Sequence, residues 1–212
     1  MTWQPRLPEE IEAESFRRIE AQVSADKFPP EVWFVVRRMI HTTADLQYLD
    51  TVRFHPQAVA AGVEALKAGR PVVTDTRMLL AGISTGRLGR LGVEAACFMD
   101  EPAVAEEAGR RGTTRAAVAM ERSLPGRAGG IVAIGNAPTA LLRLIELLKG
   151  GAPPPALVVG LPVGFVNAAE AKEALTRQAC PYITALGPKG GSAVAAAVVN
   201  ALAIMALEET ES

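Results

Sequence analysis

The amino-acid sequence predicts an α/β fold: one domain over residues 1–212, with a mostly parallel five-stranded sheet, helices on both faces and an N-terminal helical layer. A chain of 212 residues is long enough to bury one full hydrophobic core. From residue 71 onward, short apolar runs alternate with longer helical stretches. Because these runs lack the in-and-out alternation of half-exposed strands, they predict a parallel sheet that is covered on both faces.

The chain before this region is predicted to be helical. An approximate apolar stripe over 8–24 indicates an amphipathic helix, and two prolines separate it from a second helix at about 31–44. A third helix covers 56–69 and ends at a glycine, the residue type favoured just past a helix C-terminus. Residues 46–55 show no clear pattern. These helices account for the predicted N-terminal layer.

The five apolar runs are the strand candidates, at 71–74, 93–98, 130–134, 156–159 and 182–186. Helices are expected near 76–82, 101–122 (broken around Gly112), 137–149, 168–178 and 191–207. The last helix contains the longest apolar run, which is alanine-rich, short for a membrane span and interrupted by Asn200. We therefore expect a buried helix there, suited also to a subunit contact.

Composition excludes several classes of protein. The formal net charge is −1 and the pI is about 6.2, whereas a nucleic-acid-binding surface normally shows a basic excess. Cys97 and Cys180 form no spaced pair, and with only two histidines the chain has no plausible zinc or iron site. Free thiols and a polar, proline-broken segment at Met1–Glu10 predict a cytoplasmic protein without a signal peptide.

The carboxyl ends of parallel strands meet at one edge of the sheet, where ligands bind. Four of these ends carry polar or glycine-bearing segments, at 74–78, 133–139, 160–167 and 187–192. Natural capping residues precede the following helices: Asp75 or Thr76, Asn136, and Asn167 with Glu170. Free N–H groups at helix starts favour an anionic ligand. None of the segments matches a nucleotide-binding fingerprint.

His41 is the candidate for proton transfer, because histidine titrates near neutral pH and the chain has only two. It ends a helix that also carries Arg37 and Arg38 on its outer face, and Asp45 follows four residues later. A carboxylate at this spacing favours the imidazolium, while the arginines and burial oppose it. The same residues also fit a helix-end histidine that caps carbonyl groups.

Two further basic segments are candidates for ligand contact. Residues 84–92 form an arginine-bearing loop that fits either a lid or a solvated connection. Arg115 follows a helix start at Thr113–Thr114 and is a better ligand candidate than Arg110 and Arg111, which fit a solvated charge run.

Groups of residues spread in order over nearly the whole chain carry a family resemblance: Glu14–Phe16, Arg38–His41 with Asp45, Asp75–Met78 through Gly82–Ile83, Ala133–Leu141, Pro162–Val166 with Glu170, Lys172 and Glu173, and Gly190–Ser192 with Asn200–Leu202. In this combination the chain resembles the precorrin-8X methylmutase family, including its cobalt-precorrin-8 members. The segment Gly187–Lys189 departs from the pattern, since it keeps one basic residue where relatives often carry more arginine.

The resemblance implies a homodimeric isomerase of cobalamin (corrin-ring) biosynthesis that needs no cofactor. Such an enzyme moves a methyl group between adjacent ring C carbons of precorrin-8X, or cobalt-precorrin-8, to give hydrogenobyrinate or cobyrinate. His41 matches the family histidine proposed to protonate the macrocycle. Chain position and resemblance together give the expected substrate-binding set: Ser15, Arg38, Thr42, Asp75, Arg77, Met78, Arg115, Asn136, Lys189 and Gly190.

A corrinoid of this stage is an apolar ring edged with carboxylates, which suits arginines, a lysine and helix N-termini around a roomy apolar crevice. Two alternatives come from other classes. A non-catalytic tetrapyrrole carrier would keep the cationic residues and could dispense with His41. A phosphate-binding α/β enzyme would also use glycine turns, but it should show a phosphate fingerprint that this sequence lacks.

Overall fold

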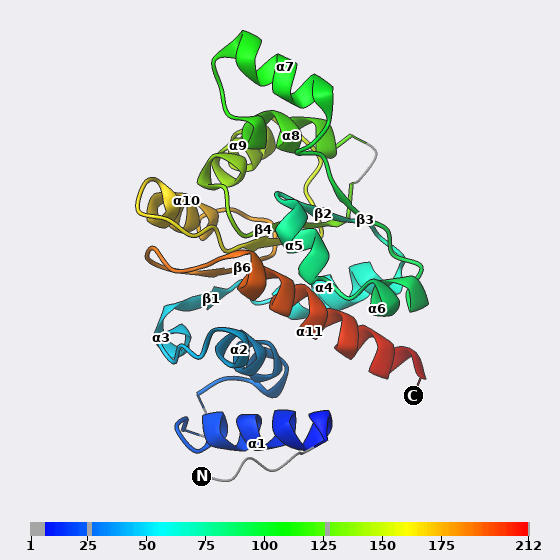
Figure 1. The fold of residues 1–212 in the computed structure, drawn as a ribbon, viewed down its shortest axis with the longest axis vertical. Helices are drawn as coiled ribbons and strands as arrows, with labels where there is room; N and C mark the ends of the chain where they lie inside the picture. Colours follow the sequence, from blue (N-terminus) through cyan, green and yellow to red (C-terminus); the bar gives the residue numbers. More distant parts are fainter. Residues whose placement is uncertain (1–6, 25–26, 126–127, 212) are drawn as a thin grey trace.

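The computed structural model describes residues 7–24, 27–125 and 128–211, which build a six-stranded sheet between two helical layers (Figure 1). The strands, in chain order, are β1 (Val52–Phe54), β2 (Val72–Thr74), β3 (Ala95–Cys97), β4 (Ile131–Ile134), β5 (Leu157–Gly160) and β6 (Tyr182–Ala185). Their order in the sheet is β1-β6-β5-β4-β2-β3, with β2 to β6 parallel. The predicted fold class and all five predicted strands are confirmed.

The predicted strand count of five is wrong by one. Strand β1 lies in the segment 46–55, where the sequence shows no clear pattern, and it pairs antiparallel with β6 at the edge of the sheet. Its three residues are too few for a periodicity signal. A short helix, α3 (Tyr48–Thr51), occupies the residues just before it.

The other helices are α1 (Pro8–Glu20), α2 (Pro30–Thr43), α4 (Ala58–Lys67), α5 (Arg77–Gly82), α6 (Thr85–Arg90), α7 (Pro102–Arg111), α8 (Arg115–Ser123), α9 (Pro138–Lys149), α10 (Ala168–Leu175) and α11 (Ser192–Glu211). The predicted break near Gly112 is confirmed, because this glycine has φ 62° and ends α7. The flexible loop expected at 84–92 is wrong: these residues form α6, whose first turn is capped by the Ser84 side chain.

Strand side chains alternate between two hydrophobic cores. On one face of the sheet, Ile131, Leu157 and Ile183 pack with α2, α4 and α11. On the other face, Val132 and Val158 pack with α8, α9 and α10. Figure 1 shows α11 running along the first face and α8 to α10 gathered on the other side of the strands. The prediction of helices on both faces is therefore confirmed.

The predicted N-terminal layer is also confirmed: α1 lies against the outer side of α2 (Figure 1). Phe16 and Ile19 of α1 are buried in this contact, and α2 in turn buries Val36 and Met39 against the main core. Residues 1–6 of the polar N-terminal segment lie outside the described residues.

Helix α11 is the predicted buried helix. Among the described helices, its stretch Ser192–Thr210 is the one long and apolar enough to cross a membrane by length and composition. However, 56% of the apolar window is buried inside the protein, where the helix packs on α2, α4 and α5. Asn200 is the polar residue within the apolar run, and its side-chain amide accepts from Ser84 N and donates to Gly82 O.

Asp75 joins the carboxyl ends of β2 and β4. These neighbours form the topological switch point of the sheet, because β3 is added on one side of β2 and β4 on the other. Its buried carboxylate accepts hydrogen bonds from the main-chain N–H groups of Gly135, Asn136 and Ala137 at 2.8–3.1 Å. Burial raises the pKa of Asp75, and these three donors act in the opposite direction. The N–H groups expected to be free for an anionic ligand at this strand end are thus already bound by a side chain.

The capping predictions have mixed outcomes. Thr76 caps α5 as expected, accepting from Leu79 N at 3.2 Å. Asn136 is not the cap of α9, because the cap position is Ala137 and the helix begins at Pro138. The N–H of Asn136 donates to Asp75. Asn167 occupies the cap position of α10, but its left-handed backbone (φ 61°) goes with no side-chain capping bond. The expected pair with Glu170 therefore does not form.

Asp75→Asn should lower the free energy of unfolding by about 1–3 kcal/mol, because the amide NH₂ cannot accept and leaves at least one buried N–H without a partner. Urea unfolding at pH 7 measures this. The matched control is Asp100→Asn, whose exposed carboxylate pairs with Arg77 at 2.9 Å and should contribute less than about 1 kcal/mol. Equal losses in the two variants would contradict the structural role of Asp75.

Candidate active site

His41 lies in the last turn of α2, where it is exposed and faces the neighbouring helix α1. Ser15 of α1 places its Oγ 2.7 Å from His41 Nδ1, and the Phe16 ring packs edge-on against the imidazole with 5.3 Å between centroids. These contacts fix the imidazole orientation from one side. The structure therefore brings together Ser15 and His41, which are 26 residues apart in the sequence.

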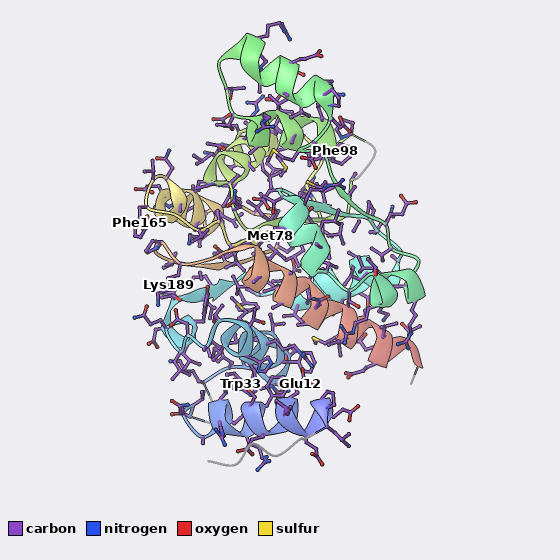
Figure 2. All side chains as sticks on the ribbon, viewed as in Figure 1. Glu12, Trp33, Met78, Phe98, Phe165 and Lys189 are labelled. Atoms are coloured by element: carbon purple, nitrogen blue, oxygen red, sulfur yellow. The ribbon has the colours of Figure 1, made fainter. Side chains whose placement is uncertain are left out.

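Arg37 and Arg38 form the predicted basic face of α2, but this face is covered by α1. Arg37 pairs with Glu20 at 2.5 Å and Arg38 with Glu12 at 3.2 Å. Both guanidinium groups also stack on Phe16, at 4.1 and 5.2 Å from its centroid, in cation–π contacts. Arg38, which is expected to contact the substrate, is therefore already engaged between two helices. Its partner Glu12 lies on α1, on the side that faces α2 (Figure 2).

The spacing of four residues suggested that Asp45 would pair with His41. In the structure Asp45 has other partners. Helix α2 ends at Thr43, and Ala44 has a left-handed conformation (φ 52°) that turns the chain away from the helix. The Asp45 carboxylate instead accepts from Lys189 Nζ and from Gln47 N. The hydrogen bond from Lys189 is the largest cause that holds the pKa of Asp45 below its ordinary value.

Lys189 lies in the loop between β6 and α11, which crosses the carboxyl edge of the sheet. Gly191 N donates to Leu161 O at 2.9 Å, and Gly164 N donates to Pro188 O at 3.0 Å. Gly190 packs so closely on the segment after β5 that a Cβ there would overlap the Leu161 carbonyl group. The loop after β5 and the loop after β6 are thus held together, and Lys189 belongs to the loop after β6.

A third tie comes from α10. Lys172 is fully buried, and its Nζ donates to the main-chain oxygen of Lys189 at 2.6 Å. Burial lowers the pKa of Lys172 from 10.5 to about 8. A lysine was not expected in this core, although the sequence offers one signal: Lys172 stands between apolar residues on the inward face of an otherwise amphipathic helix.

A second group of predicted residues surrounds Asp75. Thr76 Oγ1 lies 3.1 Å from Ser192 Oγ, and a Cβ at Gly135 would come within 2.7 Å of Ser192 Cα, so the start of α11 is in contact with both loops. Asp75 is buried and its carboxylate is already bound by three main-chain N–H groups, so its place in the expected substrate-binding set stays a prediction. Met78 and Asn136 are exposed at this edge.

Arg77 and Arg115 stand further out. Arg77 pairs with Asp100 at 2.9 Å, and its side chain stays 67% exposed. Arg115 is the first residue of α8, and the preceding Thr114 donates a hydrogen bond to Thr139 in the first turn of α9 at 2.9 Å. Both arginines therefore lie near the carboxyl edge of the sheet, but in the described structure neither contacts His41 or its neighbour Ser15. Thr42 is exposed beside His41.

Sequence reasoning missed an exposed apolar segment in the loop after β5. Phe165 is 98% exposed, Val166 is 76% exposed and Val163 is 44% exposed, although their loop is held to the loop after β6 as described above. Figure 2 shows Phe165 and Lys189 on the same side of the molecule. The available signal was three large apolar residues placed in a glycine-bearing turn, where solvated residues are expected.

Nothing in the described residues suggests a metal centre. Within 7–24, 27–125 and 128–211 there is no group of three or more histidine, cysteine or acidic side chains that could hold an ion. Cys97 is half-buried, Cys180 is buried, and both are free thiols. The described side chains at this edge offer an imidazole, cationic groups and an apolar segment.

These features give an α/β fold that places an imidazole, cationic side chains and an exposed apolar segment at the carboxyl end of its sheet, where folds of this class bind ligands. Comparison with known proteins gives the family. Residues 10–205 match the family model described as CbiC, precorrin-8X methylmutase, and the chain belongs to the precorrin-8X methylmutase family. The resemblance read from the sequence is confirmed.

The relatives agree over nearly the full chain. The cobalt-precorrin-8 methylmutase of Priestia megaterium is 44% identical over 94% of this chain and 88% of its own length. The precorrin-8X methylmutase of Pseudomonas aeruginosa is 43% identical, over 91% of this chain and 93% of its own. A solved precorrin-8X methylmutase from Thermus thermophilus superposes with a TM-score of 0.86 at 41% identity, covering 94% of this chain and 98% of that one.

Lys172 should make the stability of the protein depend on alkaline pH. Between pH 8 and 10.5 the unfolded chain keeps a proton on this lysine that the folded chain has lost, so folding becomes more favourable as pH rises through this window. Relative to Lys172→Met, the wild type should gain up to about 3 kcal/mol of unfolding free energy between pH 7 and pH 10.5. Urea unfolding at both pH values measures the gain.

The matched control is Lys149→Met, which removes an exposed lysine from α9. Its difference from the wild type should be the same at both pH values, because no buried charge is relieved. A pH-independent difference for Lys172→Met as well would show that the buried amine does not titrate in this window.

Proposed function

We propose that this protein catalyses the isomerisation of precorrin-8X or cobalt-precorrin-8, moving a methyl group between adjacent carbons of ring C to give hydrogenobyrinate or cobyrinate. The observation that carries the proposal is the family match over residues 10–205. The site is consistent with such a substrate, because the apolar segment around Phe165 and the cationic Lys189 suit a ring edged with carboxylates. We place the enzyme in the cytoplasm.

In the proposed mechanism, His41 donates a proton to the bound macrocycle. The added charge withdraws electron density from the conjugated ring and so lowers the barrier to migration of the methyl group. Because isomerisation makes no net change in protons, the imidazole takes the proton back when the product forms. In its charged form, His41 donates through Nδ1 to Ser15 Oγ, which leaves the opposite ring nitrogen to face the substrate.

The substrate carboxylates would be bound by Lys189, Arg77 and Arg115, three cations distributed along the carboxyl edge of the sheet. Met78 and Phe165, both largely exposed, would supply apolar contact with the ring. The expected set also includes Thr42, Asn136 and Gly190 in the same segments, and Ser15 and Arg38 beside His41. Asp75 would act indirectly, by fixing the turn that carries Asn136.

His41→Ala should abolish most turnover while ligand binding and folding are retained, because the lost interaction belongs to the transition state. General acid catalysis of this kind accounts for about 10²–10⁴ in rate. The change in visible spectrum on conversion of precorrin-8X measures turnover, and titration with hydrogenobyrinate measures binding. Near-normal turnover in this variant would rule out the acid role.

His55→Ala is the matched control, since it removes the only other histidine. His55 follows β1 and pairs with the start of β6, so it lies at the amino-terminal edge of the sheet, opposite the proposed site. Its loss should leave kcat unchanged. A wild-type protein that binds hydrogenobyrinate but never converts precorrin-8X would instead support a tetrapyrrole carrier.

We also propose that the enzyme is a homodimer that uses the outer face of α11. Ala197 and Ile204 are only half-buried on this otherwise buried helix. Sedimentation at micromolar concentration should give about twice the chain mass of 22.3 kDa. Ala197→Glu should shift the protein towards monomer, because it places a charge in the apolar contact, whereas a wild type that sediments as a monomer would contradict the proposal.

A further inference from the structure

One buried charged group has no role in the reaction as proposed. Lys172 of α10 has no exposed surface, and it is the largest of the fully buried side chains described. Burying an amine without compensation is costly, so a lysine in this position calls for a specific partner. That partner is the main-chain oxygen of Lys189, 2.6 Å from Lys172 Nζ.

The loop that Lys172 holds is rich in residues without side chains. Gly187 has φ 84° and Gly191 has φ 132°, and Gly190 lies between them. Glycines allow this crossing of the sheet edge, but they also make the unbound loop conformationally free. Two of its ties are hydrogen bonds between main-chain atoms, at Gly191 and Pro188. At Lys189 the main-chain oxygen is instead held by a side chain, that of Lys172.

We propose that Lys172 is a positioning residue for substrate binding, which fixes the peptide group of Lys189 and thereby holds the Lys189 side chain at the site. The inference rests on the proposed function, since it assigns Lys189 to a substrate carboxylate. Lys172 itself does not touch the substrate, because it is enclosed beneath the loop.

The chemistry of the amine suits this role. Charged or neutral, a lysine amine carries N–H groups, so the hydrogen bond to Lys189 O persists in both protonation states. The burial that lowers the pKa of Lys172 to about 8 therefore leaves the tie in place over the neutral range. A fixed peptide group restricts the position of the Lys189 Cα. The Lys189 side chain can then move from Asp45 to a substrate carboxylate by a change of rotamer alone.

A double-mutant cycle tests the inference, with Lys172→Met, Lys189→Met and the double variant. The readouts are the Kd for hydrogenobyrinate and the separate kcat and KM for precorrin-8X. Lys172→Met should raise Kd and KM about tenfold, within the range of couplings between neighbouring residues, and should leave kcat within about twofold. In the Lys189→Met background the same substitution should have no further effect, because the side chain that it positions is gone.

Leu175→Met is the matched control on the same buried face of α10, since it perturbs packing without removing a hydrogen-bond donor. Its Kd should equal that of the wild type. Additive effects of Lys172→Met and Lys189→Met, or an unchanged Kd in Lys172→Met, would overturn the inference.

Hydrogen exchange of the wild type and of Lys172→Met supplies a test that needs no ligand. The Gly191 amide, which donates to Leu161 O beside the bond from Lys172, should exchange faster in Lys172→Met than in the wild type. Equal exchange rates in the two proteins would overturn the proposed hold. A wild type that neither binds hydrogenobyrinate nor converts precorrin-8X would refute the proposed function. The assignment to substrate binding would fall with it, while the exchange rates would still decide whether the loop is held.

Discussion

The close crossing of the loops after β5 and β6 is the constraint on which the rest of the site depends. Gly190 lies against the Leu161 carbonyl group with no room for a side chain, and Gly191 N donates to that same oxygen. On either side of this crossing, Lys189 pairs with Asp45, and Ser192 contacts Thr76 in the turn that carries Asp75. The two groups of site residues are therefore placed relative to each other by one short, tightly packed segment.

The fold was largely predictable because its signals are local. Apolar runs with helices between them indicate a covered parallel sheet, and β1 is the exception because its three residues form no pattern of their own. The site was less predictable because its contacts are long-range. Asp45 stands four residues from His41 in sequence, yet its partner is Lys189, 144 residues away. Likewise, no local pattern shows that the carboxylate of Asp75 will occupy the N–H groups of residues 135–137.

Most of the cationic side chains near the site already form an ion pair with a carboxylate of the protein. Arg37 pairs with Glu20, Arg38 with Glu12, Lys189 with Asp45 and Arg77 with Asp100. A substrate carboxylate that binds Lys189 or Arg77 must therefore share or replace an internal carboxylate. Binding at these points is an exchange of ion pairs rather than the neutralisation of bare charge, so its net gain is smaller than the attraction alone would suggest.

The contact between Ser15 and His41 joins two helices that differ in how firmly they are held. Helix α2 buries four residues in the main core, whereas α1 adds only Phe16 and Ile19 at the margin of that core. Peripheral elements of this kind open with less free energy than the core around the sheet. On warming, α1 should detach while the sheet is still intact, and His41 then loses its hydroxyl partner. We therefore expect the enzyme to lose activity at a lower temperature than the one at which the sheet unfolds, because of this one amphipathic helix.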